Sequence, residues 1–113
     1  MDKLDKLYLT TYIENIERII RYLEKIDCKI RYSLYAFENG TPSNAIGHLS
    51  HGLGNGVNKE IQGHSLYDYI EYNTGLTLEE ISIINKCKHT MEIVAFLENL
   101  LENEYKTRLE KYV

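Results

Sequence analysis

The sequence predicts an all-α protein, a small helical bundle of two long antiparallel helices with a short-helix and glycine-rich loop region capping one end. Three observations support this fold class. Apolar residues recur every three or four positions in the first and last thirds of the chain. Neither third contains glycine or proline, whereas the middle third contains all seven glycines and the single proline. No alternation of strands and helices is visible, and no hairpin is predicted.

The first long helix is predicted over residues 3–38. Its apolar residues have heptad spacing, which Asp27 interrupts at a place where the helix could kink or where its apolar face meets solvent or a partner. No helix-breaking residue occurs before Asn39 and Gly40, so the helix is expected to continue to that point. The predicted buried positions are Leu9, Ile13, Ile16, Ile20, Leu23, Ile30, Leu34 and Phe37.

The second long helix is predicted over residues 77–112, and its start has a clear signature. Thr77 and Glu80 have the spacing of a capping box, in which each side chain binds the backbone N–H of the other residue. Leu76 and Ile81 flank the box as a hydrophobic staple. The predicted buried positions follow at helical spacing: Ile81, Ile84, Cys87, Met91, Val94, Leu97, Leu101, Tyr105, Leu109 and Tyr112.

Residues 39–76 are expected to form short helices and loops. Thr41 and Pro42 are placed to cap and begin one short helix, which the glycines after residue 51 would end. Ser65 is the predicted cap of a second short helix, which ends near residue 73 and is closed by Gly75. Residues 57–62 fit either an extended segment or a helical turn. The whole chain, residues 1–113, is expected to be one helical domain.

The predicted helix lengths favour a homo-oligomer, a dimer or larger. A helix of about 35 residues is about 50 Å long, whereas a compact domain of this size has a radius of gyration of about 13 Å. Either one of the helices breaks, or the elongated monomer leaves apolar surface for another copy of the chain to cover, and the second alternative is favoured. Residues 13–20 are the predicted interface.

Charge and composition exclude several classes of function. The net charge is −4, and no segment has the basic excess expected of a duplex nucleic-acid-binding protein. No apolar stretch approaches the roughly 20 residues of a membrane span, and the charged N-terminal segment does not resemble a signal peptide. Two cysteines in separate segments do not indicate a disulfide framework. A cytoplasmic protein is therefore expected.

The central histidines raise the possibility of a metal site or a small enzyme. His48 and His51 share a face of the predicted short helix, and His64, or Cys87 with His89, could add zinc ligands. The His-x-x-His pattern alone is weakly specific, and no nucleophile–base spacing is recognisable. The sequence therefore predicts no metal and no cofactor, and an enzyme or metal-binding protein using these histidines is the alternative function.

Residues 46–65 are the predicted binding element, because they contain three of the four histidines and five of the seven glycines. A plain connection between antiparallel helices needs only about 2–8 residues. Apolar residues at helical spacing would hold the segment on the bundle, while its polar side chains face solvent, a partner or a ligand. Glycine N–H groups and a lysine suit an anion. The predicted site residues are His48, His51, Asn55, Asn58, Lys59 and His64, joined by Arg31, Tyr35 and Tyr67.

A non-catalytic binding protein is the function that these features favour. Its expected ligand is a macromolecular partner or a small anion such as a nucleotide. A composition rich in Ile, Lys, Asn and Tyr is typical of AT-rich genomes, such as those of low-GC bacteria and their phages. A small bacterial or phage interaction protein, for example an inhibitor, is therefore the predicted class.

Overall fold

The computed structural model describes residues 3–31, 33–54 and 64–112, with the side chains of residues 3, 4, 64 and 65 outside this description. It is mostly helical, as the sequence predicts. The elements are α1 (Lys3–Ile26), β1 (Phe37–Glu38), β2 (Thr41–Pro42), α2 (Ala45–Gly52), α3 (His64–Thr74), α4 (Leu78–Asn85), α5 (Thr90–Leu100), the π-helical turn η1 (Leu101–Tyr105) and α6 (Lys106–Glu110).

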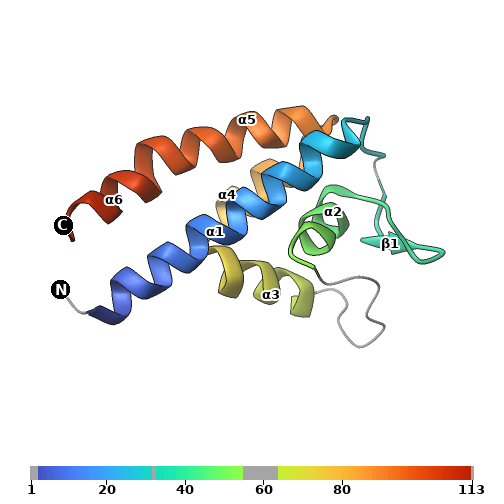
Figure 1. The fold of residues 1–113 in the computed structure, drawn as a ribbon. Helices are drawn as coiled ribbons and strands as arrows, with labels where there is room; N and C mark the ends of the chain where they lie inside the picture. The colour runs from blue at the N-terminus through green and yellow to red at the C-terminus, as the bar shows by residue number, and fades with distance from the viewer. Residues whose placement is uncertain (1–2, 32, 55–63, 113) are drawn as a thin grey trace.

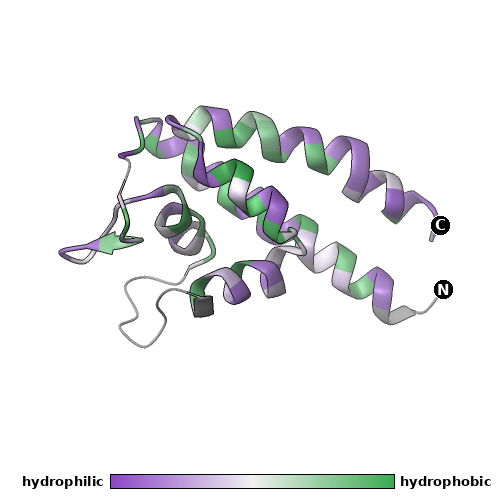
Figure 2. Ribbon diagram, turned by 180° about the vertical axis from the view of Figure 1, so that it is seen from behind, coloured by the Kyte–Doolittle hydropathy of each residue, from purple (hydrophilic) through white to green (hydrophobic). Residues whose placement is uncertain are grey.

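Two helical layers cover the two sides of α1. The continuous helix formed by α5, η1 and α6 runs beside α1 in the opposite direction, and both ends of the chain lie at the same end of the molecule (Figure 1). Helices α2 and α3 pack on the other side of α1. Figure 2 shows that α5 contains most of the hydrophobic residues of the C-terminal helix, whereas α6 is mostly hydrophilic. The molecule measures 45 × 28 × 23 Å.

The core confirms most of the predicted apolar positions in the helical parts of the chain, although Met91 in the C-terminal half is exposed and Leu109 is only partly buried. Ile16 and Leu23 of α1 are fully buried, as are Ile93 and Leu97 of α5. Complete burial of a side chain of this size contributes about 1.5–3 kcal/mol. The same core includes residues of α2, α3, α4 and η1, among them Leu49, Ile70, Ile81 and Tyr105.

Both long helices are shorter than predicted. The first ends at Ile26, because Asp27 adopts a left-handed conformation with a φ of 35°. Leu34, predicted to be buried, is 86% exposed. The second is divided at residues 86–89 into α4 and α5, and Met91 at the start of α5 is exposed. A bundle of two helices of the predicted lengths is therefore not confirmed.

The capping box at the start of α4 is confirmed. The Thr77 hydroxyl accepts a hydrogen bond from the Glu80 N–H at 3.1 Å, and the Glu80 carboxylate accepts one from the Thr77 N–H at 2.9 Å. Leu76 and Ile81, the predicted staple, are both buried. Gly75 follows α3 with a φ of 70°, as expected of a residue that closes a helix.

A short hairpin replaces the predicted end of the first helix. Phe37 pairs with Pro42 and Glu38 with Thr41, and Asn39 and Gly40 form the turn with φ values of 51° and 80°. Asn-Gly suits this turn because both central residues need a positive φ. Thr41 and Pro42 are therefore a strand, and Asn44 caps α2. On α3, Ser65 lies inside the helix and is not its cap.

Because the helices break, they are no longer too long for one compact chain, and the reason for predicting a homo-oligomer from helix length no longer holds. Helix α1 has 24 residues, which corresponds to about 36 Å. Ile13 and Ile20, in the predicted interface, are only 7% exposed, and Ile16 between them is fully buried within one chain. These residues cannot serve as an interface in this fold, and oligomerisation itself stays a prediction. No helix among the described residues has the length and apolar character to span a membrane.

Candidate functional site

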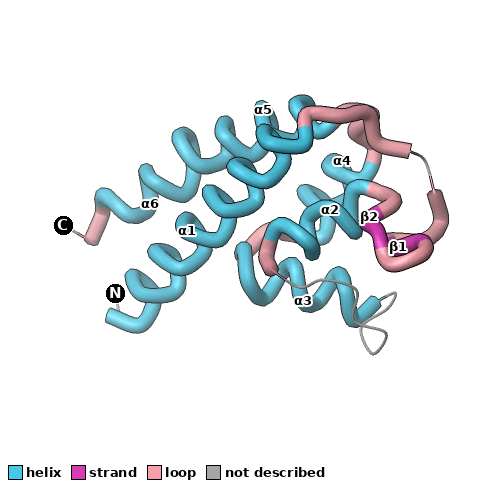
Figure 3. The backbone as a smooth tube through the Cα atoms, turned by 45° about the vertical axis from the view of Figure 1, so that its right-hand side comes forward, coloured by secondary structure: helices cyan, strands magenta, loops and turns pink. Residues whose placement is uncertain are grey.

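A cavity of about 630 Å³ opens where four parts of the fold meet. These are the segment that follows α1, the start of α2, the start of α3, and the turn between α4 and α5. Figure 3 shows the segment after α1 as a loop that leads to the hairpin of β1 and β2. The lining residues are Ile30, Arg31, Ser33, Leu34, Ala36, Asn44, Ala45, Ile46, Leu66, Tyr67, Asn85, Lys86, Cys87 and Lys88.

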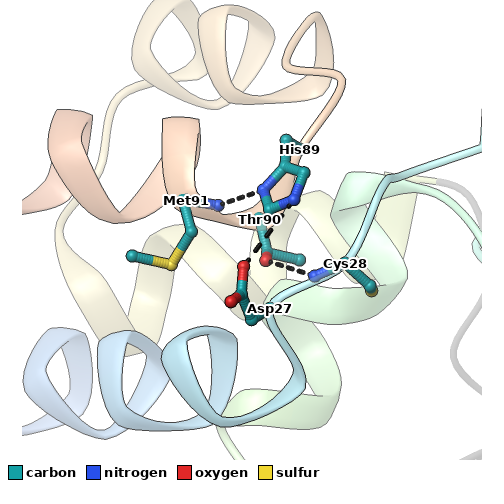
Figure 4. A network of polar contacts seen from close by, with 5 residues as sticks. All are labelled: Asp27, Cys28, His89, Thr90 and Met91. Carbon is teal, nitrogen blue, oxygen red and sulfur yellow. Dashed lines mark hydrogen bonds and ion pairs between the residues drawn. The ribbon is translucent and has the colours of Figure 1, made fainter.

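An antiparallel bridge between residues 28–30 and 88–90 forms one side of the cavity. The Thr90 N–H donates to the Cys28 carbonyl at 3.0 Å, and the Ile30 N–H donates to the Lys88 carbonyl at 2.8 Å. The Thr90 hydroxyl also accepts from the Cys28 N–H at 3.1 Å (Figure 4). These bonds engage backbone groups that an unbroken helix would satisfy internally. They bring Arg31 and Lys88 to the same opening.

His89 stabilises this bridge. Its Nδ1 accepts a hydrogen bond from the Met91 N–H at 3.1 Å, which caps α5. Its Nε2 lies 3.7 Å from a carboxylate oxygen of Asp27 (Figure 4). Among the residues with described side chains, no group of three potential ligands could hold a metal ion.

The opposite side of the cavity depends on a close approach between segment 33–36 and α2. The Asn44 side chain caps α2 by accepting from the Gly47 N–H at 3.0 Å, and its amide donates to the Ser33 carbonyl at 3.1 Å. The Ala36 carbonyl accepts from the Ser43 N–H at 2.7 Å. A Cβ atom at Gly47 would lie 1.9 Å from that carbonyl oxygen. Glycine at position 47 therefore lets the two segments pack together.

The charged groups of the cavity lining are all basic. Arg31, Lys86 and Lys88 are exposed at its edge, and no carboxylate is among the lining residues, although the whole chain has a net charge of −4. The first residues of α2 also line the cavity, so the partial positive charge of that helix terminus adds to the field. The cavity is therefore suited to an anion.

The lining below these charges is apolar. Ala45, Ile46 and Leu66 are buried, and Tyr67 is half-buried beside them. Burial, and to a lesser extent the charge of Glu92, raises the pKa of the Cys87 thiol. The thiol is then protonated at neutral pH and is a weak nucleophile. The cavity thus combines a cationic edge, an apolar floor and no activated nucleophile among its described side chains.

A carboxylate lies near the edge but is bound to the hairpin. Glu38 accepts a hydrogen bond from the Ser33 hydroxyl at 2.7 Å. Hydrogen bonds from Ser33 and Ser43, and to a smaller degree the charge of Arg31, lower the pKa of the Glu38 carboxyl. Glu38 therefore stays ionised and limits the positive field on the hairpin side.

The structure brings together two of the nine predicted site residues. Arg31 and Tyr67 both line the cavity. Tyr35 is 68% exposed and lies outside the lining. Three predicted residues, Asn55, Asn58 and Lys59, lie outside the described residues, as does the side chain of His64.

The prediction that His48 faces solvent or a ligand is wrong. His48 is buried, and its Nδ1 is 3.0 Å from the Tyr22 hydroxyl of α1. Burial, followed by the charge of His51, lowers the pKa of His48. His51 is exposed, with its ring centroid 5.0 Å from that of Tyr22. The two histidines therefore pack α2 against α1, and neither lines the cavity.

Replacing His48 by glutamine is expected to weaken the acid sensitivity of the fold. Because its pKa is lowered in the folded state, the unfolded chain binds more protons below about pH 6.5, and stability falls as the pH falls. His48→Gln removes this loss. The measurement is the urea midpoint between pH 8 and pH 5.

His51→Gln is the matched control, and it should keep most of the pH dependence because burial is the larger cause at His48. An equally steep loss of stability in His48→Gln and the parent protein would contradict the assignment.

Sequence reasoning missed the contribution of the turn between α4 and α5. Lys86 and Lys88 fall within the predicted second helix, where they look like solvent-exposed lysines. Asn85 and Cys87 also lie in that predicted helix, and the cap of α2 is Asn44 where the sequence predicts Thr41. The only local signal for this part of the cavity is the pair of lysines, Lys86 and Lys88. The pair indicates a basic site only when the helix breaks at these residues.

No family model, no curated protein and no solved structure matches this chain, so the functional assignment has to come from the residues of the cavity.

Proposed function

We propose that this protein is a non-catalytic binding protein that holds a small anionic ligand, with an apolar or aromatic part, in the cavity between α2, α3 and the α4–α5 turn. The ligand class includes nucleotides and other organic phosphates or carboxylates. One observation carries the proposal. The charged residues that line the cavity are Arg31, Lys86 and Lys88, and they surround an apolar floor.

The groups at the edge have complementary roles in this proposal. The guanidinium of Arg31 offers paired donors for a phosphate or carboxylate, while Lys86 and Lys88 act as point charges. The N–H groups of the first two residues of α2 lack acceptors within the helix and are available to the same anion, whereas the Gly47 N–H is bound to the Asn44 side chain. Ala45 and Ile46 belong to this first turn. The anionic group of the ligand is thus held between the cations and the helix terminus.

The apolar floor accounts for the second part of the ligand. Ile46, Leu66 and the ring of Tyr67 offer contact area to an aromatic or alkyl group. The volume of about 630 Å³ falls within the range of about 300–1,000 Å³ that is usual for small-molecule sites. Binding without turnover is favoured because the Cys87 thiol has a raised pKa and the described histidine side chains do not line the cavity.

Removing two of the cations is expected to weaken ligand binding at least tenfold. Each charge-assisted hydrogen bond contributes about 1.5–3 kcal/mol, and about 1.4 kcal/mol corresponds to a factor of ten. Phenyl phosphate and nucleoside monophosphates are the probes, and isothermal titration calorimetry compares the parent protein with Arg31→Ala/Lys88→Ala. Because these cations are exposed, 0.5 M salt should also weaken binding.

The control variant is Arg18→Ala/Lys25→Ala, which removes the same charge from an exposed face of α1 outside the cavity. It should bind the probes like the parent protein. The proposal is overturned if none of the probes binds, or if both double variants bind equally well.

A further inference from the structure

Two large apolar side chains extend the cavity surface into solvent. Leu34, at the mouth of the cavity, is 86% exposed, and the adjacent Tyr35 is 68% exposed. The two residues are consecutive and follow Arg31 by three and four positions in the sequence. Aromatic residues and exposed apolar patches beside a pocket are typical of protein interaction sites.

The backbone of this segment is held on both sides. The Ser33 hydroxyl accepts from the Tyr35 N–H at 3.1 Å and donates to Glu38, while the Ser33 carbonyl accepts from Asn44. The Ala36 carbonyl is bound to the Ser43 N–H. The exposed pair is therefore presented by a segment with its own hydrogen bonds, which lowers the ordering entropy that binding would otherwise require.

A small ligand in the cavity can contact Leu34, which belongs to the lining, but would leave Tyr35 uncovered. An occupant of the 630 Å³ cavity contacts the floor and the cations, whereas the ring of Tyr35 lies outside the lining. A larger occupant can place an acidic group among Arg31, Lys86 and Lys88 and cover Leu34 and Tyr35 with apolar side chains. The occupant is expected to be acidic, because the lining contains three cations and no carboxylate.

We propose that the cavity and its mouth bind an acidic segment of a partner protein, which is anchored by one large apolar side chain in the cavity and covers Leu34 and Tyr35 with another. This inference rests on the proposed function, because it uses the same cations as the anion site. Glu38 lies on the hairpin side and repels acidic groups there. The carboxylates of the segment are therefore directed to the Arg31, Lys86 and Lys88 side.

The test is a selection of random twelve-residue peptides displayed on phage against the parent protein. The expected result is enrichment of peptides that combine Asp or Glu with Leu, Phe, Tyr or Trp. An enriched peptide is then synthesised with a fluorescent label, and its affinity is measured by fluorescence anisotropy. Tyr35→Ser, which changes a side chain outside the cavity lining, should weaken the peptide at least fivefold while leaving the affinity for phenyl phosphate within twofold of the parent value.

Two further variants separate this inference from the proposed function. Glu38→Gln should strengthen peptide binding two- to fivefold, because it removes the repelling charge and keeps an acceptor for Ser33. Tyr8→Ser, which changes an exposed tyrosine near the start of α1 and outside this cavity, should have no effect.

The inference is overturned if the selection enriches no acidic–apolar peptides, or if the enriched peptide binds Tyr35→Ser as tightly as the parent protein. Unchanged phenyl phosphate binding in that experiment leaves the proposed function standing. A different result would contradict the proposed function, namely that neither phenyl phosphate nor nucleoside monophosphates bind the parent protein.

Discussion

Gly47→Ala is expected to destabilise the protein by about 3 kcal/mol and to abolish ligand binding at the cavity. In an ordinary helix this change stabilises by about 0.5–1 kcal/mol, so the expected sign is reversed. The reason is the Cβ position, 1.9 Å from the Ala36 carbonyl oxygen. That oxygen is already bound to the Ser43 N–H at 2.7 Å, so the segment cannot move away without losing this bond. Overpacking against a fixed backbone costs about 1–3 kcal/mol or more.

Urea unfolding and phenyl phosphate titration measure the two parts of this expectation. Ser50→Ala is the control in the same helix. The Ser50 hydroxyl is buried and has no hydrogen-bond partner in the described structure, so alanine should be neutral or stabilising. A Gly47→Ala protein as stable as the parent would show that segment 33–36 does not pack against α2 in this way.

Ile16→Glu is expected to unfold the chain instead of dissociating an assembly. Ile16 is fully buried within one chain, between the helices that cover the two sides of α1. A buried, unpaired carboxylate costs more than about 4 kcal/mol, which is comparable with the total stability of about 5–15 kcal/mol for a small domain. The helical signal in circular dichroism should therefore be lost or greatly reduced at 25 °C.

Thr11→Glu provides the control, because Thr11 is exposed on the same helix. That variant should keep the parent circular dichroism spectrum. Light scattering of both variants then decides between the core and interface roles of Ile16. A folded 13.2 kDa monomer from Ile16→Glu, together with a larger parent species, would restore the interface that the sequence predicted.

The sequence by itself determined the features that depend on neighbouring residues. The capping box of Thr77 and Glu80 was predicted correctly because its two hydrogen bonds connect residues three apart. The buried face of α1 from Leu9 to Leu23 follows from helical spacing. Gly75 closes α3 because glycine accepts a positive φ without strain.

A local signal and a longer pattern disagree at the predicted end of the first helix. Asn39 and Gly40 are a strong turn pair, yet heptad spacing continues through Ile30 and Leu34 up to them. The helix in fact ends at Ile26, and the two residues make a hairpin turn. Heptad spacing describes which side chains would share a face if the chain were helical, and it contains no information on whether the helix continues.

The positions of the two helix ends, and with them the cavity, were decided by tertiary structure. Asp27 and residues 86–89 have no local sequence that terminates a helix strongly. Residues 28–30 and 88–90 exchange backbone hydrogen bonds across 60 positions of sequence, and this bridge replaces the bonds that each helix would have made by continuing. The sequence pointed to Arg31 and Tyr67, but only this pairing places Lys86 and Lys88 beside them. The same limit explains His48, because its burial depends on Tyr22 of α1, a neighbour in space that its own helix does not reveal.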